Sequence, residues 1–168
     1  LFYRRQRVMP DPLPLPHPPS GGLTRAETIL GFDFGERRIG VAVGNTLTGG
    51  ASPVTIIQAT ESQLRFAQLG QLIAQWCPDR LVVGRPTHSD GKPLPVTARC
   101  ERFARQLQGR FGKPVHLVDE NYSTTSARAL DDEARTGYRG RASREDEDAA
   151  AAAIVLQQWL DQPTPALS

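Results

Sequence analysis

Residues Thr28–Asn45 read TILGFDFGERRIGVAVGN and contain two apolar runs separated by a short polar turn. Each run has the length and composition of a β-strand, so the stretch predicts a β-hairpin. The first run ends in a single acid, Asp33. An ionised carboxylate loses hydration when a core strand buries it, and it is seldom placed there without a partner. Asp33 is therefore the first candidate for a chemical role.

The rest of the chain alternates between predicted helices and strands. The β-branched run Ala51–Ile57 predicts a third strand, and its Pro53 indicates the edge of a sheet. Apolar residues at steps of three and four then predict a helix over 61–76. In chain order there follow a strand over 80–84, a loop over 85–93, a helix over 95–111, a strand over 114–118, a helix over 126–135 and a last helix after the acids 145–148. Strands separated by helices are typical of parallel pairing, so the predicted fold class is α/β.

The 168 residues are enough for one domain with a sizeable core. The segment 1–25 is rich in arginine and proline, so we expect a flexible basic arm, a domain over 26–162 and a tail over 163–168. Two cysteines, Cys77 and Cys100, lack metal-ligand spacing, and we expect no disulfide. Because no apolar run approaches the ~20 residues that span a bilayer, we expect a cytoplasmic protein with no membrane partner.

Positive charge in this chain comes almost entirely from arginine. The formal net charge is +2, from 20 Lys and Arg against 18 Asp and Glu, which excludes a polycation of the histone type. The predicted helix 95–111 nevertheless carries four arginines off its apolar stripe. They are Arg99, Arg102, Arg105 and Arg110. Such a face is either a solvated helix surface or a track for a phosphate backbone, and the sequence leaves both interpretations open.

Carboxylates come from three separate regions of the chain. Asp33 ends the first strand, Asp119 and Glu120 follow the last strand, and Asp148 adjoins the alanine-rich face of the last helix. Hard cations prefer oxygen ligands, and two of them ~3.5–4 Å apart can clamp a phosphoryl displacement. The arrangement therefore indicates a Mg²⁺ or Mn²⁺ site. The three histidines are scattered, so neither a zinc pattern nor a Ser-His-Asp set is present.

Four segments resemble, in order and with the proper spacing, the motifs of the YqgF/RuvX family of RNase H-like nucleases. They are GFDFGERRIGVAVGN, VVGRPTHSDGK, VHLVDENYSTTSA and DAAAAAIVLQQWLD, between about Ile29 and Asp161. The resemblance implies an RNase H-like fold, with a mixed five-stranded sheet of order 3-2-1-4-5, strand 2 antiparallel, and flanking helices. It also implies relationship to Holliday junction resolvases and a metal-dependent nuclease role in maturing the 5′ end of 16S ribosomal RNA. The implied partner is structured RNA or branched DNA, and the protein would be a monomer or a homodimer.

The resemblance also implies roles for particular residues. Asp33 matches the acid of the family's first strand, Glu120 the glutamate of its Val-Asp-Glu motif, and Asp148 the aspartate that opens its last helix. These three acids would be catalytic and would hold Mg²⁺ or Mn²⁺. The candidates for contacts to substrate phosphates are Arg37, Arg38, Arg85, His88, Lys92, Ser123, Thr124 and Thr125. Departures from the family pattern, such as an arginine at position 85 where leucine is usual, bear on substrate contacts rather than on the acids.

Glu120 poses a geometric question. In an RNase H-like sheet its strand lies one strand removed from the first, so about two spacings of ~4.8 Å separate it from Asp33. The side chain of Glu120 must therefore reach inward past the end of the strand over 80–84. If it does not reach, Asp119 or a water would have to complete the site.

Three other functions remain open at the level of sequence. A Holliday junction resolvase would cut four-way DNA as a dimer. An actin-like ATPase also uses an Asp-Phe-Gly strand turn, but it needs two such domains, and this chain has room for one. A catalytically silent nucleic-acid-binding module would show salt-dependent binding without turnover.

Overall fold

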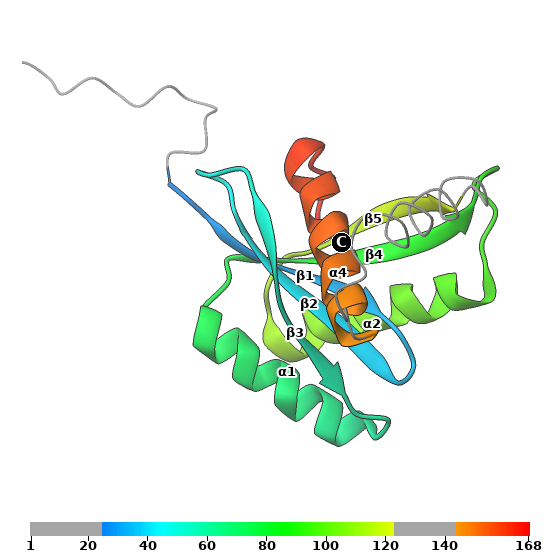
Figure 1. Ribbon diagram of the computed structural model, residues 1–168, viewed down its shortest axis with the longest axis horizontal. Helices are drawn as coiled ribbons and strands as arrows, with labels where there is room; N and C mark the ends of the chain where they lie inside the picture. The colour runs from blue at the N-terminus through cyan, green and yellow to red at the C-terminus, as the bar shows by residue number, and fades with distance from the viewer. Residues whose placement is uncertain (1–24, 123–143) are drawn as a thin grey trace, which may run out of the picture.

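The computed structural model describes residues 25–122 and 144–168 (Figure 1). All but the last residue of the predicted arm lies outside these ranges, as does the predicted helix over 126–135. The described helices and strands are, in chain order, β1 (Thr28–Phe34), β2 (Arg38–Asn45), β3 (Ala51–Gln58), α1 (Ser62–Trp76), β4 (Arg80–His88), α2 (Pro95–Phe111), β5 (Val115–Tyr122) and α4 (Arg144–Asp161). The limits of the domain, 26–162, stay a prediction.

The five strands form one sheet in the order β3-β2-β1-β4-β5. β2 pairs antiparallel with β1 and with β3, whereas β4 pairs parallel with β1 and with β5. This arrangement confirms the predicted hairpin of Thr28–Asn45 and the predicted mixed sheet. It also confirms that the strand containing Pro53 lies at a sheet edge, where a missing backbone donor is tolerated.

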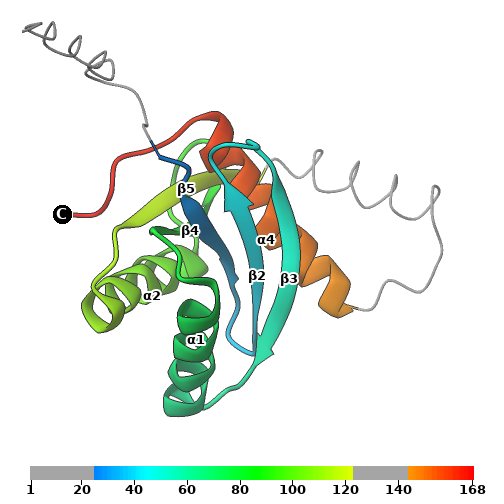
Figure 2. The ribbon, with the colours of Figure 1, turned by 90° about the vertical axis from the view of Figure 1, so that its left-hand side faces the viewer.

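Helices cover both faces of the sheet. α1 and α2 lie on one face, and α4 crosses the other (Figure 2). Successive side chains of a strand point to opposite faces, so β1 contributes to two cores. Leu30 and Phe32 are fully buried on the side of α1 and α2, while Ile29 packs with Leu156 on the side of α4. The same alternation puts Asp33 on the α4 side. Among the helices that the structure describes, none combines the length and apolar character needed to cross a lipid bilayer.

β4 and β5 extend further than the sequence predicts. Their parallel pairing runs from Leu81 opposite Val115 to His88 opposite Tyr122, so residues 85–88 belong to a strand and not to the predicted loop. Pro86 is tolerated because β1 pairs with β4 only as far as Val83, which leaves the proline beside one neighbouring strand instead of two. The loop was predicted from the polar side chains of this stretch. Backbone hydrogen bonds to β5 do not depend on these side chains, so the stretch pairs as a strand. The acids expected after the last strand therefore lie within β5.

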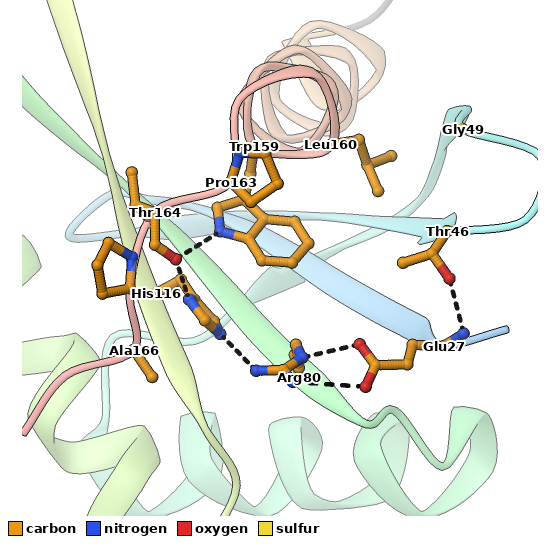
Figure 3. A pocket seen from close by; sticks show the side chains of 11 residues that line it. Glu27, Thr46, Gly49, Arg80, His116, Trp159, Leu160, Pro163, Thr164 and Ala166 are labelled. Carbon is orange, nitrogen blue, oxygen red and sulfur yellow. Dashed lines mark hydrogen bonds and ion pairs between the residues drawn. The ribbon is translucent and has the colours of Figure 1, made fainter. Parts of the chain in front are cut away.

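A polar network lies at the end of the sheet that is opposite to Asp33. Figure 3 shows the residues of this network. His116 of β5 is buried, and its Nδ1 lies 2.6 Å from the carbonyl oxygen of Thr164, beyond the end of α4. Its Nε2 lies 3.3 Å from a guanidinium nitrogen of Arg80, which also forms an ion pair with Glu27 at 2.8 Å. The His116 ring packs against Trp159, with 4.8 Å between ring centroids. Through these contacts the segment expected as a C-terminal tail is held along β5.

The geometry assigns His116 a neutral ring. Nδ1 must carry its proton to donate to Thr164, so Nε2 is left to accept a hydrogen bond from Arg80. Protonating Nε2 would place a positively charged N–H donor next to the guanidinium of Arg80, which is itself a charged donor. Burial lowers the pKa of His116, and the charge of Arg80 lowers it further, while the backbone carbonyls and Glu27 act in the opposite direction.

This network predicts a pH-dependent contribution to stability. A histidine with a lowered pKa in the folded protein takes up protons more readily when unfolded, so its contribution is present above pH ~6.5 and is lost as the pH falls through the lowered value. Denaturant unfolding of His116→Asn, which keeps a donor toward Thr164 but cannot titrate, should therefore depend less steeply on pH below 6.5 than the parent. The exposed His88→Asn serves as the matched control, and equal pH dependence in all three proteins would contradict the assignment.

Candidate active site

Asp33 lines a pocket at the carboxyl end of β1. The pocket has a volume of about 470 Å³, and eight residues surround it, from β1 and the turn after it, β2, β4, α2 with the residue before it, and α4. They are Asp33, Phe34, Gly35, Arg38, Pro86, Leu94, Val96 and Asp148. The pKa of Asp33 is raised from 3.8 to about 6, first because burial removes water from the carboxylate and second because Asp148 adds a nearby negative charge. Two of the three predicted acids therefore share one pocket.

Asp148 reaches this pocket because α4 lies very close to β2. Asp33 is paired with Gly40 of β2, and a Cβ atom placed on Gly40 would lie 2.0 Å from the backbone oxygen of Asp148. Only a residue without a side chain leaves room for the helix at this point. The carboxylate of Asp148 also lies 3.8 Å from the guanidinium of Arg38. At that distance the arginine is positioned to offset part of the repulsion between the two acids.

Glu120 extends over β4 from the neighbouring strand. Along β5 its side chain points to the same side of the sheet as Val118, which packs with the residues of α4. Between Glu120 and β1 lies Gly84, and a Cβ atom placed there would be 3.5 Å from the Cδ of Glu120. The absence of a side chain at Gly84 thus leaves the space over β4 that the carboxyl group needs. The sequence alone did not single out Gly84 or Gly40, although glycine within a strand is a known signal of close approach.

Asp119 does not share this side of the sheet. It points toward α2, where its carboxylate lies 2.8 Å from Nε of Arg85, and a second nitrogen of that arginine lies 2.7 Å from Glu101. The alternation of β5 separates the two neighbouring acids, one to each face. Asp119 is therefore not placed to substitute for Glu120.

Cys100 of α2 lies within reach of the negative charge of the candidate site. Its thiol is buried, and its pKa is raised to about 12 by burial and then by the negative charges of Asp33, Glu120 and Glu101. The charges of both predicted catalytic acids therefore contribute to raising the pKa of this thiol. The pocket itself is lined by Asp33 and Asp148 and not by Glu120. Within residues 25–122 and 144–168, no three side chains of His, Cys, Asp or Glu are gathered closely enough to form a complete metal site.

The predicted phosphate contacts are placed in different surroundings. Arg38 lines the pocket, and Arg37 is exposed in the adjoining turn. His88 and Lys92 are exposed at and beyond the end of β4. Arg85 points to the opposite face, so the structure does not bring it to the pocket. Ser123, Thr124 and Thr125 lie outside the described residues.

Comparison with known proteins identifies the family. The sequence profile of RuvX, described as a Holliday junction resolvase, matches residues 27–162. This chain belongs to the RuvX family. A relative from Burkholderia lata named "Putative pre-16S rRNA nuclease" is 51% identical over 143 residues, which cover 85% of this chain and 95% of the relative. One of the same name from Burkholderia ambifaria is 50% identical with the same coverage. The resemblance to YqgF/RuvX proteins is thereby confirmed.

Solved structures confirm the RNase H-like fold of this RuvX chain. RuvC of T. thermophilus in complex with a Holliday junction substrate is 17% identical with a TM-score of 0.50, and the match covers 84% of this chain and 99% of RuvC. The fowlpox virus Holliday junction resolvase is 11% identical with a TM-score of 0.50, over 80% of this chain and 98% of the resolvase. At these identities the likeness establishes the fold alone.

Proposed function

We propose that this chain is a nuclease that hydrolyses phosphodiester bonds in the maturation of the 5′ end of 16S ribosomal RNA. Membership of the RuvX family and relatives at about half identity, named for pre-16S rRNA, support a hydrolase of this kind. One observation about the site carries the proposal. Asp33 and Asp148 share a pocket, and Glu120 approaches it across the bare backbone of Gly84.

The carboxylates fit a Mg²⁺ or Mn²⁺ cofactor by their chemistry. Burial, and after it the negative charge of Asp148, raises the pKa of Asp33 to about 6, and a bound cation would favour the ionised form of both acids. We expect Asp33 and Asp148 to hold the ion together with Glu120. When bound, such an ion would polarise the scissile phosphate and lower the pKa of an attacking water. The complete site would require Glu120 to move inward from its position over β4.

The protein's own groups have separate tasks in this proposal. Arg38 lies at the pocket beside Asp148, where its guanidinium is placed to bind a phosphate oxygen of the substrate. Arg37, in the exposed turn after Asp33, would hold a flanking phosphate. Phe34, Leu94 and Val96 supply the apolar part of the pocket wall. Hydrolysis would thus occur between the acids and Arg38, at the carboxyl end of β1.

Holliday junction resolution is the alternative substrate class. It is favoured by the description of the family and by the shared fold with RuvC. The same pocket serves both reactions, since both hydrolyse a phosphodiester bond. A resolvase would act as a dimer with paired cuts on four-way DNA, whereas an rRNA nuclease requires neither property.

A defined substrate panel separates these functions. We expect the purified protein with Mg²⁺ or Mn²⁺ to cut an RNA spanning the 5′ end of precursor 16S rRNA in preference to four-way DNA. Glu120→Gln should lower the rate by at least ~100-fold, because a carboxylate of the site is lost. Asp119→Asn, the adjoining acid on the other face, is the matched control and should retain cleavage. Preferential symmetric cutting of the junction would favour the resolvase, and binding of either substrate without turnover under any metal would favour a silent module.

A further inference from the structure

The outward side of α2 carries four arginines, Arg99, Arg102, Arg105 and Arg110, here called the arginine strip. All four are exposed. Among the described residues, Arg102 and Arg105 have no hydrogen-bond or ion-pair partner. The other two are tied to neighbouring elements: Arg99 forms an ion pair with Glu36, and the guanidinium of Arg110 lies 4.0 Å from the ring centroid of Phe66.

The arginine strip begins at the candidate active site. Leu94 and Val96, at the start of α2, line the same pocket as Asp33. One turn further along the helix, Arg99 contacts Glu36 in the turn that follows β1. The later members of the strip follow toward the other end of α2, away from the pocket. A strand of nucleic acid that leaves the pocket along α2 would therefore meet these arginines in succession.

No acid of α2 opposes this charge on its outward side. The only acid of the helix is Glu101, and its carboxylate turns toward the sheet, where it lies 2.7 Å from Arg85. Because Glu101 is paired with Arg85, its negative charge does not neutralise the arginine strip. Because a guanidinium presents a fork of donors that matches phosphate oxygens, a row of exposed arginines, two of them without an ion-pair partner among the described residues, fits a phosphate backbone better than an uncharged surface.

The length of the strip suits several phosphates. From Arg99 to Arg110 an α-helix advances about 16 Å at 1.5 Å per residue. Phosphates of one strand of a duplex follow one another at about 3.4 Å along the axis, so roughly five of them would face the strip. A solvated helix surface requires no such alignment with a catalytic pocket.

We propose that the arginine strip is a track for the phosphate backbone of the nucleic acid whose scissile bond occupies the Asp33 pocket. The inference rests on the proposed function, because it takes the substrate of that pocket to be a nucleic acid. It adds a second contact region outside the pocket, on a helix that contributes no catalytic acid. Its effect is on affinity and on the dependence of binding on salt.

Binding can be tested without cleavage in an Asp33→Asn background. Fluorescence anisotropy would report the Kd for a labelled precursor 16S rRNA fragment and for a four-way DNA junction over a series of KCl concentrations. The test variant is Arg102→Gln/Arg105→Gln. Its matched control is Arg25→Gln/Lys113→Gln, which removes the same charge at the end of the sheet opposite the pocket. The substrate bound more tightly in the background protein identifies the nucleic acid that uses the track.

We expect the slope of log Kd against log salt to fall by about 1.4 to 1.8 in the strip variant, since each phosphate contact contributes ~0.7 to ~0.9. Affinity near physiological salt should fall by about 10-fold or more. The control should keep the slope of the background protein. Equal slopes in all three proteins, or an equal loss in both double variants, would overturn the proposal.

Cleavage by the unmodified chain, measured separately, keeps the two proposals apart. If that chain cuts neither substrate while the strip variant selectively loses binding, the track stands and the proposed nuclease function fails. If the unmodified chain cuts and the strip variant binds as tightly as the background protein, the nuclease function stands and the track fails.

Discussion

Replacing Asp33 by asparagine should abolish cleavage and at the same time stabilise the folded protein at neutral pH. The loss of activity, at least ~100-fold, follows from removing a carboxylate that would hold the metal ion. The gain in stability follows from removing a charge that burial and Asp148 disfavour. Metal-dependent cleavage of the precursor RNA and denaturant unfolding without metal measure the two effects on the same variant.

The sign of the stability effect depends on pH. The pKa of Asp33 is about 6 in the fold against 3.8 ordinarily, so the folded protein holds the proton more tightly. The favourable contribution is fully present below pH ~4 and is lost as the pH rises through 6. Above that value the ionised form costs about 2–3 kcal/mol. Asp33→Asn should therefore gain roughly that much free energy of unfolding near pH 8 and little near pH 4.

A control and a metal titration make this result specific. Glu147→Gln removes an exposed acid beside Asp148 and should change neither cleavage nor the pH dependence of unfolding appreciably. Added Mg²⁺ should stabilise the unmodified protein more than Asp33→Asn, because a ligand that binds the folded state alone raises its stability. Retained cleavage in Asp33→Asn would refute the proposed mechanism. A stability difference that is the same at pH 4 and pH 8 would refute the account of its charge.

The order of the strands could be predicted because the pattern of the sequence and the pattern of the fold agree. The apolar runs on either side of Phe34–Arg37 produce the hairpin, and alternating helices and strands produce the parallel part of the sheet. The ends of β4 and β5 could not be predicted in the same way. Their last residues are polar and include Pro86, and they are strand because each pairs with the other, which is a non-local effect.

The motifs predict roles for the three acids, but they do not predict how the fold brings these acids together. Side-chain alternation decides between Asp119 and Glu120, and it can be applied only once the register of β5 is known. The reach of Glu120 depends on Gly84 in a different strand. Similarly, the charge at Arg85 suggested a phosphate contact, whereas its partners Glu101 and Asp119 come from two other elements. A sequence shows which groups are present, and their partners depend on the packing.

Gly40→Ala should weaken both the fold and the catalytic site, although the substitution adds only a methyl group. The new Cβ would lie 2.0 Å from the backbone oxygen of Asp148, and real Cβ atoms essentially never approach closer than 3.0 Å. The start of α4 must therefore shift outward by about 1 Å, and overpacking of this kind costs roughly 1–3 kcal/mol. We expect a corresponding loss in the free energy of unfolding, measured with denaturant.

The same shift would carry Asp148 away from Asp33. A displacement of about 1 Å in a catalytic group can lower a rate by ~100-fold, so cleavage should fall even at temperatures where the variant is fully folded. Because the carboxylates move apart, the pKa of Asp33 should also fall toward its ordinary value. Gly109→Ala is the matched control: nothing lies within 4 Å of its Cβ position, and alanine there should stabilise α2 by about 0.5–1 kcal/mol. If Gly40→Ala kept full activity and left the pKa of Asp33 unchanged, then the close approach of α4 to β2 would have no part in assembling the site.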